Sequence, residues 1–199
     1  MMVNLAGRKC VVVGAGTIAA GKIEGLLRCG AEVTVVSPRA VDAIQRLAEA
    51  KSVVWRRRAF SPRDVRGIFL AVAATNSTEA NEAVFRACTA QGVLCNSVDE
   101  PEHCDFIYPA VVRRGPLQVA ISTGGHSPAL AARLRRELER QFGPQWGAWV
   151  EDLGRRRNEM LRKKLTAKSR RRLQQMAAPK AFRGFVSARG PIPARKRPA

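Results

Sequence analysis

The sequence predicts an α/β protein built on a parallel sheet, and three observations lead to that fold class. Short apolar runs alternate with segments of helical periodicity through the first half of the chain. The runs at residues 9–13 and 68–74 are continuous, as in strands buried on both faces. The first run leads directly into a glycine-rich turn and then a helix. This order is typical of a doubly wound, Rossmann-like sheet with right-handed βαβ crossovers.

The alternation assigns the elements in chain order. We predict strands at residues 9–13, 32–36, 52–56, 68–74 and 93–96, and helices at residues 17–29, 41–50 and 77–91. In the first helix Ile23 and Leu27 share one face, and Gly30 stands where a left-handed C-terminal cap is expected. Each helix is therefore a crossover between parallel strands.

The alternation of strand and helix patterns ends at Phe106. The stretches FIYPAVVRRG and PLQVAIST predict two strands joined at Gly115-Pro116, with no helix between them. Ser127-Pro128 then supplies a cap residue and a first-turn proline for a helix. An apolar stripe at i+4 spacing follows: Leu130, Leu134, Leu138 and Phe142. A further amphipathic helical stretch runs from about residue 145 to 176.

The charge of the chain is concentrated at its end. The 35 Lys and Arg residues exceed the 16 Asp and Glu residues, which gives a formal charge of +19, and residues 151–199 alone hold 16 basic and three acidic side chains. Such an excess suits a polyanion such as nucleic acid, a membrane surface or a multiply carboxylated small molecule. Only Phe182 and Phe185 could stack on bases there, so nucleic acid is disfavoured. Residues 179–199 lack periodicity and are predicted to be a disordered basic tail.

The five cysteines form no CxxC pair, and three of them lie in apolar runs, so we expect reduced core thiols. Neither a signal peptide nor a run of 18 apolar residues is present. The sequence therefore predicts a cytoplasmic protein with no membrane partner.

The turn after the first strand predicts a dinucleotide site. VVVGAGTIAAGK places Gly14, Gly16 and Ala19 in a G-x-G-x-x-A pattern between strand and helix. The first glycine permits the tight turn, the second admits a pyrophosphate, and Ala19 lets helix and strand pack closely. The phosphate would rest on the helix N-terminus, at Thr17 and Ile18.

The expected acidic residue at the end of the second strand is missing. The chain has Ser37, Pro38 and Arg39 there, of which Ser37 can bond a ribose hydroxyl and Arg39 a 2′-phosphate. The residues alone therefore leave NAD versus NADP open.

Ligands of open parallel sheets bind beyond the carboxyl ends of the strands. Two strands end in polar residues, at Thr75-Asn76 and at Asn96, and Asp99 follows the second. This position beside the cofactor predicts that Asp99 is a general base.

The other polar residues of this loop have simpler interpretations. Glu100, Glu102 and Asp105 are expected to face solvent or to cap the turn around Pro101. His103 and Cys104 are adjacent in sequence and have no second Cys/His pair at ligand spacing, so no metal site is predicted.

Several motifs together resemble one family: GAGTIAAGK, VTVVSP, FLAVAATNSTEAN and NSVDEPEHCDFIYPAVVRRGPLQVAISTGGHSPALAARLRREL. Over residues 5–150 the chain is similar to the precorrin-2 dehydrogenase module of siroheme synthases. The resemblance implies NAD-dependent oxidation of precorrin-2 to sirohydrochlorin, followed in some members by insertion of ferrous iron to give siroheme. It implies NAD as cofactor, the two tetrapyrroles and ferrous ion as substrates, and an intertwined homodimer.

The resemblance also assigns the substrate site. The functional aspartate of the family falls on Asp99, and its serine at the substrate cleft falls on Ser127. The amides of Gly124 and Gly125, with Ser127 and the following helix N-terminus, could hold substrate carboxylates. Arg113, Arg114 and His126 are further candidates for carboxylate contacts, although an arginine in a turn is usually just solvated. Ala15 and Gly21 depart from residues common in the family, and the tail has no counterpart in it.

The predicted organisation is an NAD-binding Rossmann domain (residues 1–112), a dimerisation segment (113–144), a helical C-terminal domain (145–178) and the basic tail (179–199). The sequence leaves open whether iron insertion occurs and what His126 and the tail do. The alternative hypothesis is a non-enzymatic dinucleotide sensor or nucleic-acid-binding protein that uses the tail.

Overall fold

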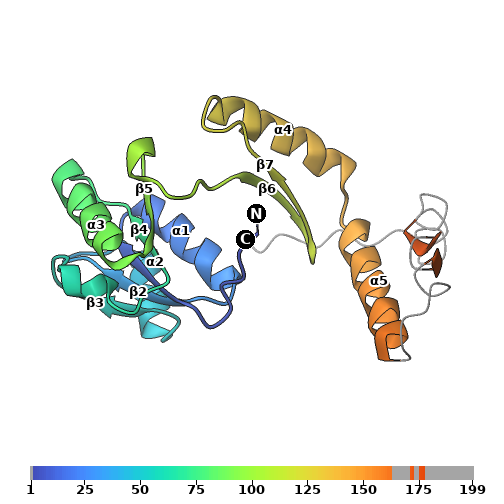
Figure 1. The fold of residues 1–199 in the computed structure, drawn as a ribbon, viewed down its shortest axis with the longest axis horizontal. Helices are drawn as coiled ribbons and strands as arrows, with labels where there is room; N and C mark the ends of the chain where they lie inside the picture. The colour runs from blue at the N-terminus through green and yellow to red at the C-terminus, as the bar shows by residue number, and fades with distance from the viewer. Residues whose placement is uncertain (1, 163–170, 173–174, 178–199) are drawn as a thin grey trace. The chain divides into compact units, whose positions relative to one another are not determined.

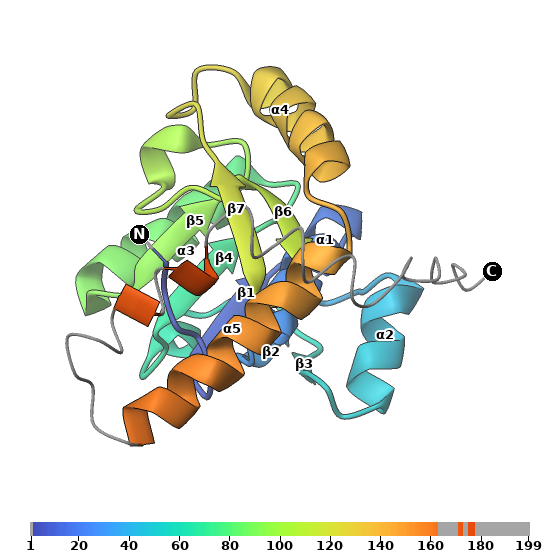
Figure 2. The same cartoon turned by 90° about the vertical axis from the view of Figure 1, so that its right-hand side faces the viewer.

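The computed structural model describes residues 2–162, 171–172 and 175–177. The chain divides into two compact units, Met1–Ile107 and Tyr108–Ala199, and each is described by itself (Figures 1 and 2). The predicted tail at 179–199, and most of the predicted helical stretch after residue 162, lie outside the described residues.

The first unit is built on a parallel sheet with the strand order β3-β2-β1-β4-β5. The strands are β1 (Lys9–Val13), β2 (Glu32–Val36), β3 (Val54–Arg56), β4 (Leu70–Ala73) and β5 (Leu94–Ser97). Every neighbouring pair is parallel. The chain moves outward from β1 to β3 and then returns to the other side of β1, so the strand order reverses between β1 and β4. The predicted Rossmann-like fold class is confirmed.

Three α-helices and one short 3₁₀ helix connect these strands, and a second 3₁₀ helix follows β5. They are α1 (Thr17–Arg28), α2 (Asp42–Glu49), η1 (Pro62–Val65), α3 (Thr78–Gln91) and η2 (Pro101–His103). The crossovers from β1 to β2 and from β4 to β5 run in opposite directions, so right-handed connections place α1 and α3 on opposite faces of the sheet. The side chain of Ser77 caps α3, and Gly92 ends it at φ +63°.

The central strands form the core because they are apolar on both faces. All of β4 is buried, as are four of the five residues of β1, and one cluster joins them to Val84 and Cys88 of α3. The strands predicted at 52–56 and 68–74 are shorter in the structure. Turns precede both strands: Lys51 has φ +56° and Gly67 has φ +66°, and the Ile68 amide donates to Val65.

The strand register brings the ligand-binding turns together. Val13 pairs with Val36 on one side and with Ala73 on the other, and Ala73 pairs with Ser97. The residues after these strands therefore leave the sheet at a single carboxyl edge.

The second unit begins with an antiparallel pair of strands, β6 (Ala110–Arg114) and β7 (Leu117–Ile121), joined by a turn in which Gly115 has φ +57°. Two helices follow, α4 (Pro128–Gln141) and α5 (Gln145–Arg162). Arg114 donates to the carbonyls of Phe142 and Glu139 at the end of α4, at 2.6 and 2.9 Å. This side chain therefore bonds carbonyls at the end of the helix, and its contact with a substrate carboxylate stays a prediction.

Candidate functional site

The two glycines of the turn between β1 and α1 have different surroundings. Gly14 has φ +100°, and a Cβ atom placed on it would overlap the carbonyl oxygen of Ala74. Gly16 is the residue before α1 with an extended backbone, and no side chain caps the helix there. A Cβ on Gly16 would meet no atom within 4 Å. The free N-terminal amides of α1 and the open space before them form an anion site of the kind that a pyrophosphate requires.

Two adjoining cavities lie along this turn. One has a volume of about 550 Å³ and the other about 740 Å³. Both are lined by Gly16, Val41, Ala74, Thr75 and Asn76, so they form one continuous cleft over the carboxyl edge of the sheet. Each volume is within the usual range of ligand sites, roughly 300–1,000 Å³. We call the smaller cavity the Ser37 lobe and the larger one the Asp99 lobe.

The Ser37 lobe is lined by Ser37, Pro38 and Arg39, as the sequence predicts. The Ser37 hydroxyl donates to the carbonyl of Arg39 at 2.7 Å, and the Trp55 indole donates to the carbonyl of Ser37 at 2.9 Å. The hydroxyl oxygen can still accept a bond from a ribose. No acidic residue lines this lobe.

The Asp99 lobe is lined by Thr17, Ile18, Asp99, Glu100 and other residues of the same edge. Asp99 is exposed, and its φ of +63° places it in the left-handed region that few non-glycine residues adopt. Its side chain lines the cavity, where a ligand can reach it. Burial lowers the pKa of the half-buried Lys22, while Cys104 and Asp99 act in the opposite direction, so this ammonium lies within electrostatic reach of Asp99.

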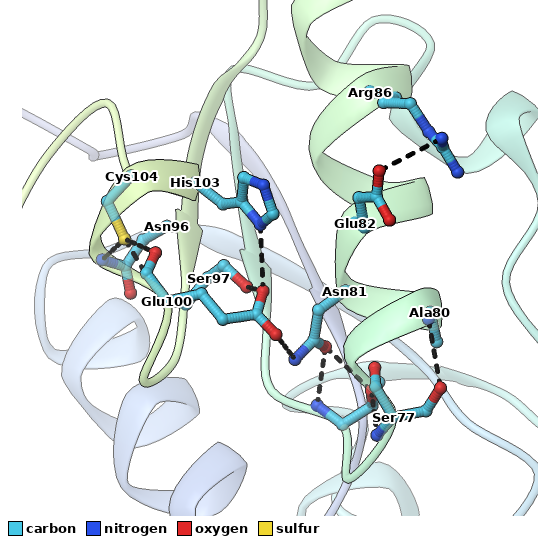
Figure 3. A network of polar contacts seen from close by, with 11 residues as sticks. Ser77, Ala80, Asn81, Glu82, Arg86, Asn96, Ser97, Glu100, His103 and Cys104 are labelled. Atoms are coloured by element: carbon cyan, nitrogen blue, oxygen red, sulfur yellow. Dashed lines mark hydrogen bonds and ion pairs between the residues drawn. The ribbon is translucent and has the colours of Figure 1, made fainter.

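Beside Asp99, the carboxylate of Glu100 is turned into a polar network (Figure 3). It accepts hydrogen bonds from the Ser97 hydroxyl at 2.7 Å, from His103 Nδ1 at 3.1 Å and from Asn81 Nδ2 at 3.4 Å. The expectation that Glu100 faces solvent or caps the turn accounts only for the His103 contact. Its other two contacts reach β5 and α3.

Asn96 lies near the carboxyl end of β5, and its predicted contact with the cofactor stays a prediction. It is not among the residues that line either lobe. Its amide donates to Cys104 Sγ at 3.3 Å (Figure 3). It also donates to the Phe106 carbonyl at 2.9 Å, and the two bonds hold the loop that carries Asp99. Burial raises the pKa of Cys104, which keeps it a thiol that can donate to the carbonyl of Ser97.

The described residues contain no group of three or more His, Cys, Asp or Glu side chains that could hold a metal ion. His103 instead stacks on Phe85, with ring centroids 4.8 Å apart. The five cysteines are all free thiols.

The predicted substrate-binding residues belong to the second unit. The Ser127 hydroxyl accepts a bond from the Leu130 amide at 3.2 Å, which caps α4. Gly124 and Gly125 both have positive φ, and the Gly124 amide already donates to the Ser122 hydroxyl at 3.1 Å. Arg113 and His126 are placed in this unit as well, on β6 and in the turn before α4 respectively.

Sequence reasoning missed three residues of the first unit: Lys22, Asn81 and Glu100. Asn81 lies in the TNSTEAN stretch after β4. It is a polar residue in the first turn of α3, and such a residue could have been expected to face the end of β4. Lys22 follows the glycine pattern by one helical turn.

Fold and site define a dinucleotide-binding α/β domain joined to a small strand-and-helix unit. The family model described as "Putative NAD(P)-binding" matches residues 1–110, and the model described as "Sirohaem biosynthesis protein central" matches residues 114–141. The chain belongs to the first of these families, and its resemblance to the precorrin-2 dehydrogenase module of siroheme synthases is confirmed. The predicted NAD-type cofactor is confirmed with it.

Individual relatives agree with this assignment. The chain is 40% identical over 147 residues to "Siroheme synthase" of Nitrosococcus oceani, covering 74% of this chain and 31% of the relative. It is 37% identical over 185 residues to "Siroheme synthase 1" of Pectobacterium atrosepticum, covering 93% and 38%. The chain therefore spans about a third of the length of these relatives. Among solved structures, "SirC, precorrin-2 dehydrogenase" is 28% identical with a TM-score of 0.78, covering 94% of this chain and 96% of that one.

Proposed function

We propose that this chain oxidises precorrin-2 to sirohydrochlorin with NAD. The observation that carries the proposal is the continuity of the cleft: the glycine turn and the Asp99 carboxylate line the same cavity. The similarity to a precorrin-2 dehydrogenase over nearly the whole chain supports the choice of substrate.

The residues of the cleft fit the cofactor. Gly16 and the α1 N-terminus at Thr17 and Ile18 would hold the pyrophosphate, because this turn presents free amides and leaves space that a side chain would fill. Ser37 and Pro38 would contact the adenosine ribose. Thr75 and Asn76 line both lobes and would contact the other half of the dinucleotide. When bound, NAD supplies the hydride acceptor.

Asp99 would supply the proton acceptor. The oxidation removes two hydrogens from the macrocycle, one as a hydride with its electron pair and one as a proton. The Asp99 side chain is exposed and lines the same lobe as Gly16 and the α1 N-terminus, so it lies within the cavity proposed for cofactor and substrate. We infer that it takes the proton from the carbon framework as the hydride leaves, which is general-base catalysis.

We propose that the turn before α4 binds substrate carboxylates. Its support is the N-terminus of α4, where Ser127 and the amides of a glycine-rich turn meet a helix dipole. A pair of substitutions tests this: Ser127→Asn and Ser127→Asp both keep a good cap, but only the aspartate repels a carboxylate. We expect the KM for precorrin-2 to be about tenfold higher for the aspartate variant than for the asparagine variant. Equal KM values would exclude this turn from the substrate site.

We further infer that the chain is a homodimer. Among the described residues, the buried apolar residues of the second unit are Val112, Ala131 and Trp149 only, whereas Leu130 on α4 is 46% exposed. A two-stranded antiparallel pair with so small a core is marginally stable by itself. Sedimentation equilibrium should give twice the chain mass, and a monomer at micromolar concentration would contradict the inference.

We propose a cytoplasmic location, which the free thiols support. The described residues include no helix long and apolar enough to cross a bilayer. Retention of the chain in the soluble cytosolic fraction would be the expected result, and its recovery from an oxidising compartment would contradict the proposal.

The function is tested by adding anaerobic precorrin-2 and NAD to the full chain and following the absorption spectrum. We expect sirohydrochlorin and NADH to form in equal amounts. Ferrous ion is then added, and formation of siroheme would assign iron insertion to the same chain. A chain that binds NAD but leaves precorrin-2 unchanged would overturn the proposal in favour of a dinucleotide sensor.

A further inference from the structure

We propose that Glu100 is the positioning residue of Asp99: by joining the Asp99 loop to the turn at Thr75, it sets where the Asp99 carboxylate lies in the cleft. This inference rests on the proposed function, because the catalytic role of Asp99 belongs to that proposal.

Glu100 is built into the protein rather than presented to solvent. Its side chain is 15% exposed, and both carboxylate oxygens are used. Oε2 accepts from the Ser97 hydroxyl and from His103 Nδ1, and Oε1 accepts from Asn81. A carboxylate can only accept, so His103 must carry its hydrogen on Nδ1 to complete this bond. Three donors from β5, η2 and α3 therefore fix one side chain (Figure 3).

Through Asn81 the network reaches Thr75, which also lines the cleft. Asn81 is 3% exposed, and its Oδ1 lies 3.2 Å from the Thr75 amide and 2.8 Å from the Thr75 hydroxyl, both of which donate to it. Thr75 lines both lobes of the cleft. The carboxamide of Asn81 thus connects Glu100 to the cofactor side of the site.

The backbone at Asp99 needs such support. A left-handed conformation at a non-glycine residue costs about 1–3 kcal/mol and persists only where neighbouring contacts hold it. Glu100 directly follows Asp99, and its side-chain bonds fix the position of the backbone beside Asp99. The Cys104 thiol donates to the carbonyls of Ser97 and Glu100, at 3.1 and 3.4 Å, and closes the same loop through the backbone.

The two neighbouring carboxylates are therefore chemically different. The bond from Ser97, followed by those from His103 and Asn81, lowers the pKa of Glu100, so it stays ionised and is a poor proton acceptor. The exposed Asp99 side chain lines the cavity and takes no part in these three bonds. This difference assigns proton transfer to Asp99 and positioning to Glu100.

The experiment compares Glu100→Gln with Glu102→Gln, a matched control in the same turn whose side chain is exposed. Single-turnover oxidation of precorrin-2 is measured for both variants, for Asp99→Asn and for the double variant Asp99→Asn/Glu100→Gln. NAD affinity is measured by calorimetry, and hydrogen exchange of the His103 amide reports the order of the loop. Ser97→Ala, which removes one donor, is the second variant if Glu100→Gln does not fold.

We expect Glu100→Gln to slow oxidation roughly 10- to 100-fold, the scale of a misplacement of about 1 Å. Glu102→Gln should stay within about twofold of the natural chain, and NAD affinity within about threefold in every variant. Because Glu100 acts through Asp99, adding Glu100→Gln to Asp99→Asn should slow oxidation by less than about twofold more. Ser97→Ala should follow the same pattern with a smaller loss, and exchange at His103 should rise.

Two results would overturn the inference alone: an active natural chain whose rate Glu100→Gln leaves unchanged, or equal further slowing in the Asp99→Asn background. The second result would mean that Glu100 supports the fold in general. A natural chain that does not oxidise precorrin-2 at all would overturn the proposed function, and this inference with it.

Discussion

Replacing each glycine of the first turn separates folding from cofactor binding. Gly14→Ala places a methyl group against the carbonyl oxygen of Ala74 and forces a side chain onto a backbone with φ +100°. The backbone strain alone costs about 1–3 kcal/mol, and relief of the overlap requires β1 or the Ala74 turn to shift. We expect the free energy of unfolding to fall by roughly 3 kcal/mol or more.

Gly16→Ala should behave differently. The new methyl group meets no atom within 4 Å, and the backbone there is extended, which alanine adopts readily. Alanine is a poorer cap residue than glycine, but it also reduces the entropy of the unfolded chain, so the net change in stability should stay within about 1 kcal/mol. The methyl group occupies the space assigned to the pyrophosphate. Loss of one hydrogen bond to a charged phosphate, about 1.5–3 kcal/mol, should weaken NAD binding roughly 10- to 150-fold.

Urea unfolding gives the stability of both variants, and isothermal titration calorimetry gives their NAD affinity. Gly25→Ala is the matched control, because Gly25 lies in the middle of α1 with open space around it and lines neither lobe. It should raise stability by about 1 kcal/mol and leave NAD binding unchanged. NAD binding to Gly16→Ala with undiminished affinity would refute the placement of the pyrophosphate, and a fully stable Gly14→Ala would refute the close-approach argument.

Two further substitutions test the packing of each unit. Asp64 is buried, and bonds from Arg58, Ser61 and Arg56 lower its pKa from 3.8 to about 2. A carboxyl whose pKa is lowered in the folded state stabilises the fold above about pH 4, and this stabilisation is lost as pH falls toward about 2. Asp64→Asn should therefore lower the free energy of unfolding, measured in urea, by roughly 2 kcal/mol at pH 7 and by little at pH 2. A loss of unfolding free energy that is the same at both pH values would contradict this prediction. In the second unit, a Cβ on Gly147 would lie 2.7 Å from the carbonyl oxygen of Arg114. Gly147→Ala should therefore lower the melting temperature of that unit by several degrees in calorimetry. An unchanged melting temperature would contradict that contact.

The sequence was sufficient to predict the sheet, because its signal is local. The continuous apolar runs of β1 and β4 and the glycine turn between β1 and α1 require only neighbouring residues to interpret. The ends of β3 and β4 were less predictable, since Lys51 and Gly67 begin turns whose bonds depend on adjacent helices. The apolar pattern of the sequence fits β3 and β4 equally well when each strand starts two residues earlier.

The candidate site was predictable where it follows from backbone position. Asp99 and the glycine turn lie at the carboxyl edge because parallel strands end there. The inward turn of Glu100 could not be predicted, because it depends on Asn81, which is 19 residues away in sequence and meets it only in the folded unit. The side-chain contacts of Asn96 could not be predicted for the same reason, since its bond to the Phe106 carbonyl arises from the return of the loop.

The central claim is that Asp99 removes a proton from a reduced tetrapyrrole beside NAD. The most direct measurement is the single-turnover rate of NADH formation from anaerobic precorrin-2, compared between the natural chain and Asp99→Asn with both saturated with NAD. We predict a rate about 10²- to 10⁴-fold lower for the variant, with unchanged NAD affinity. Equal rates in the two proteins would contradict the account.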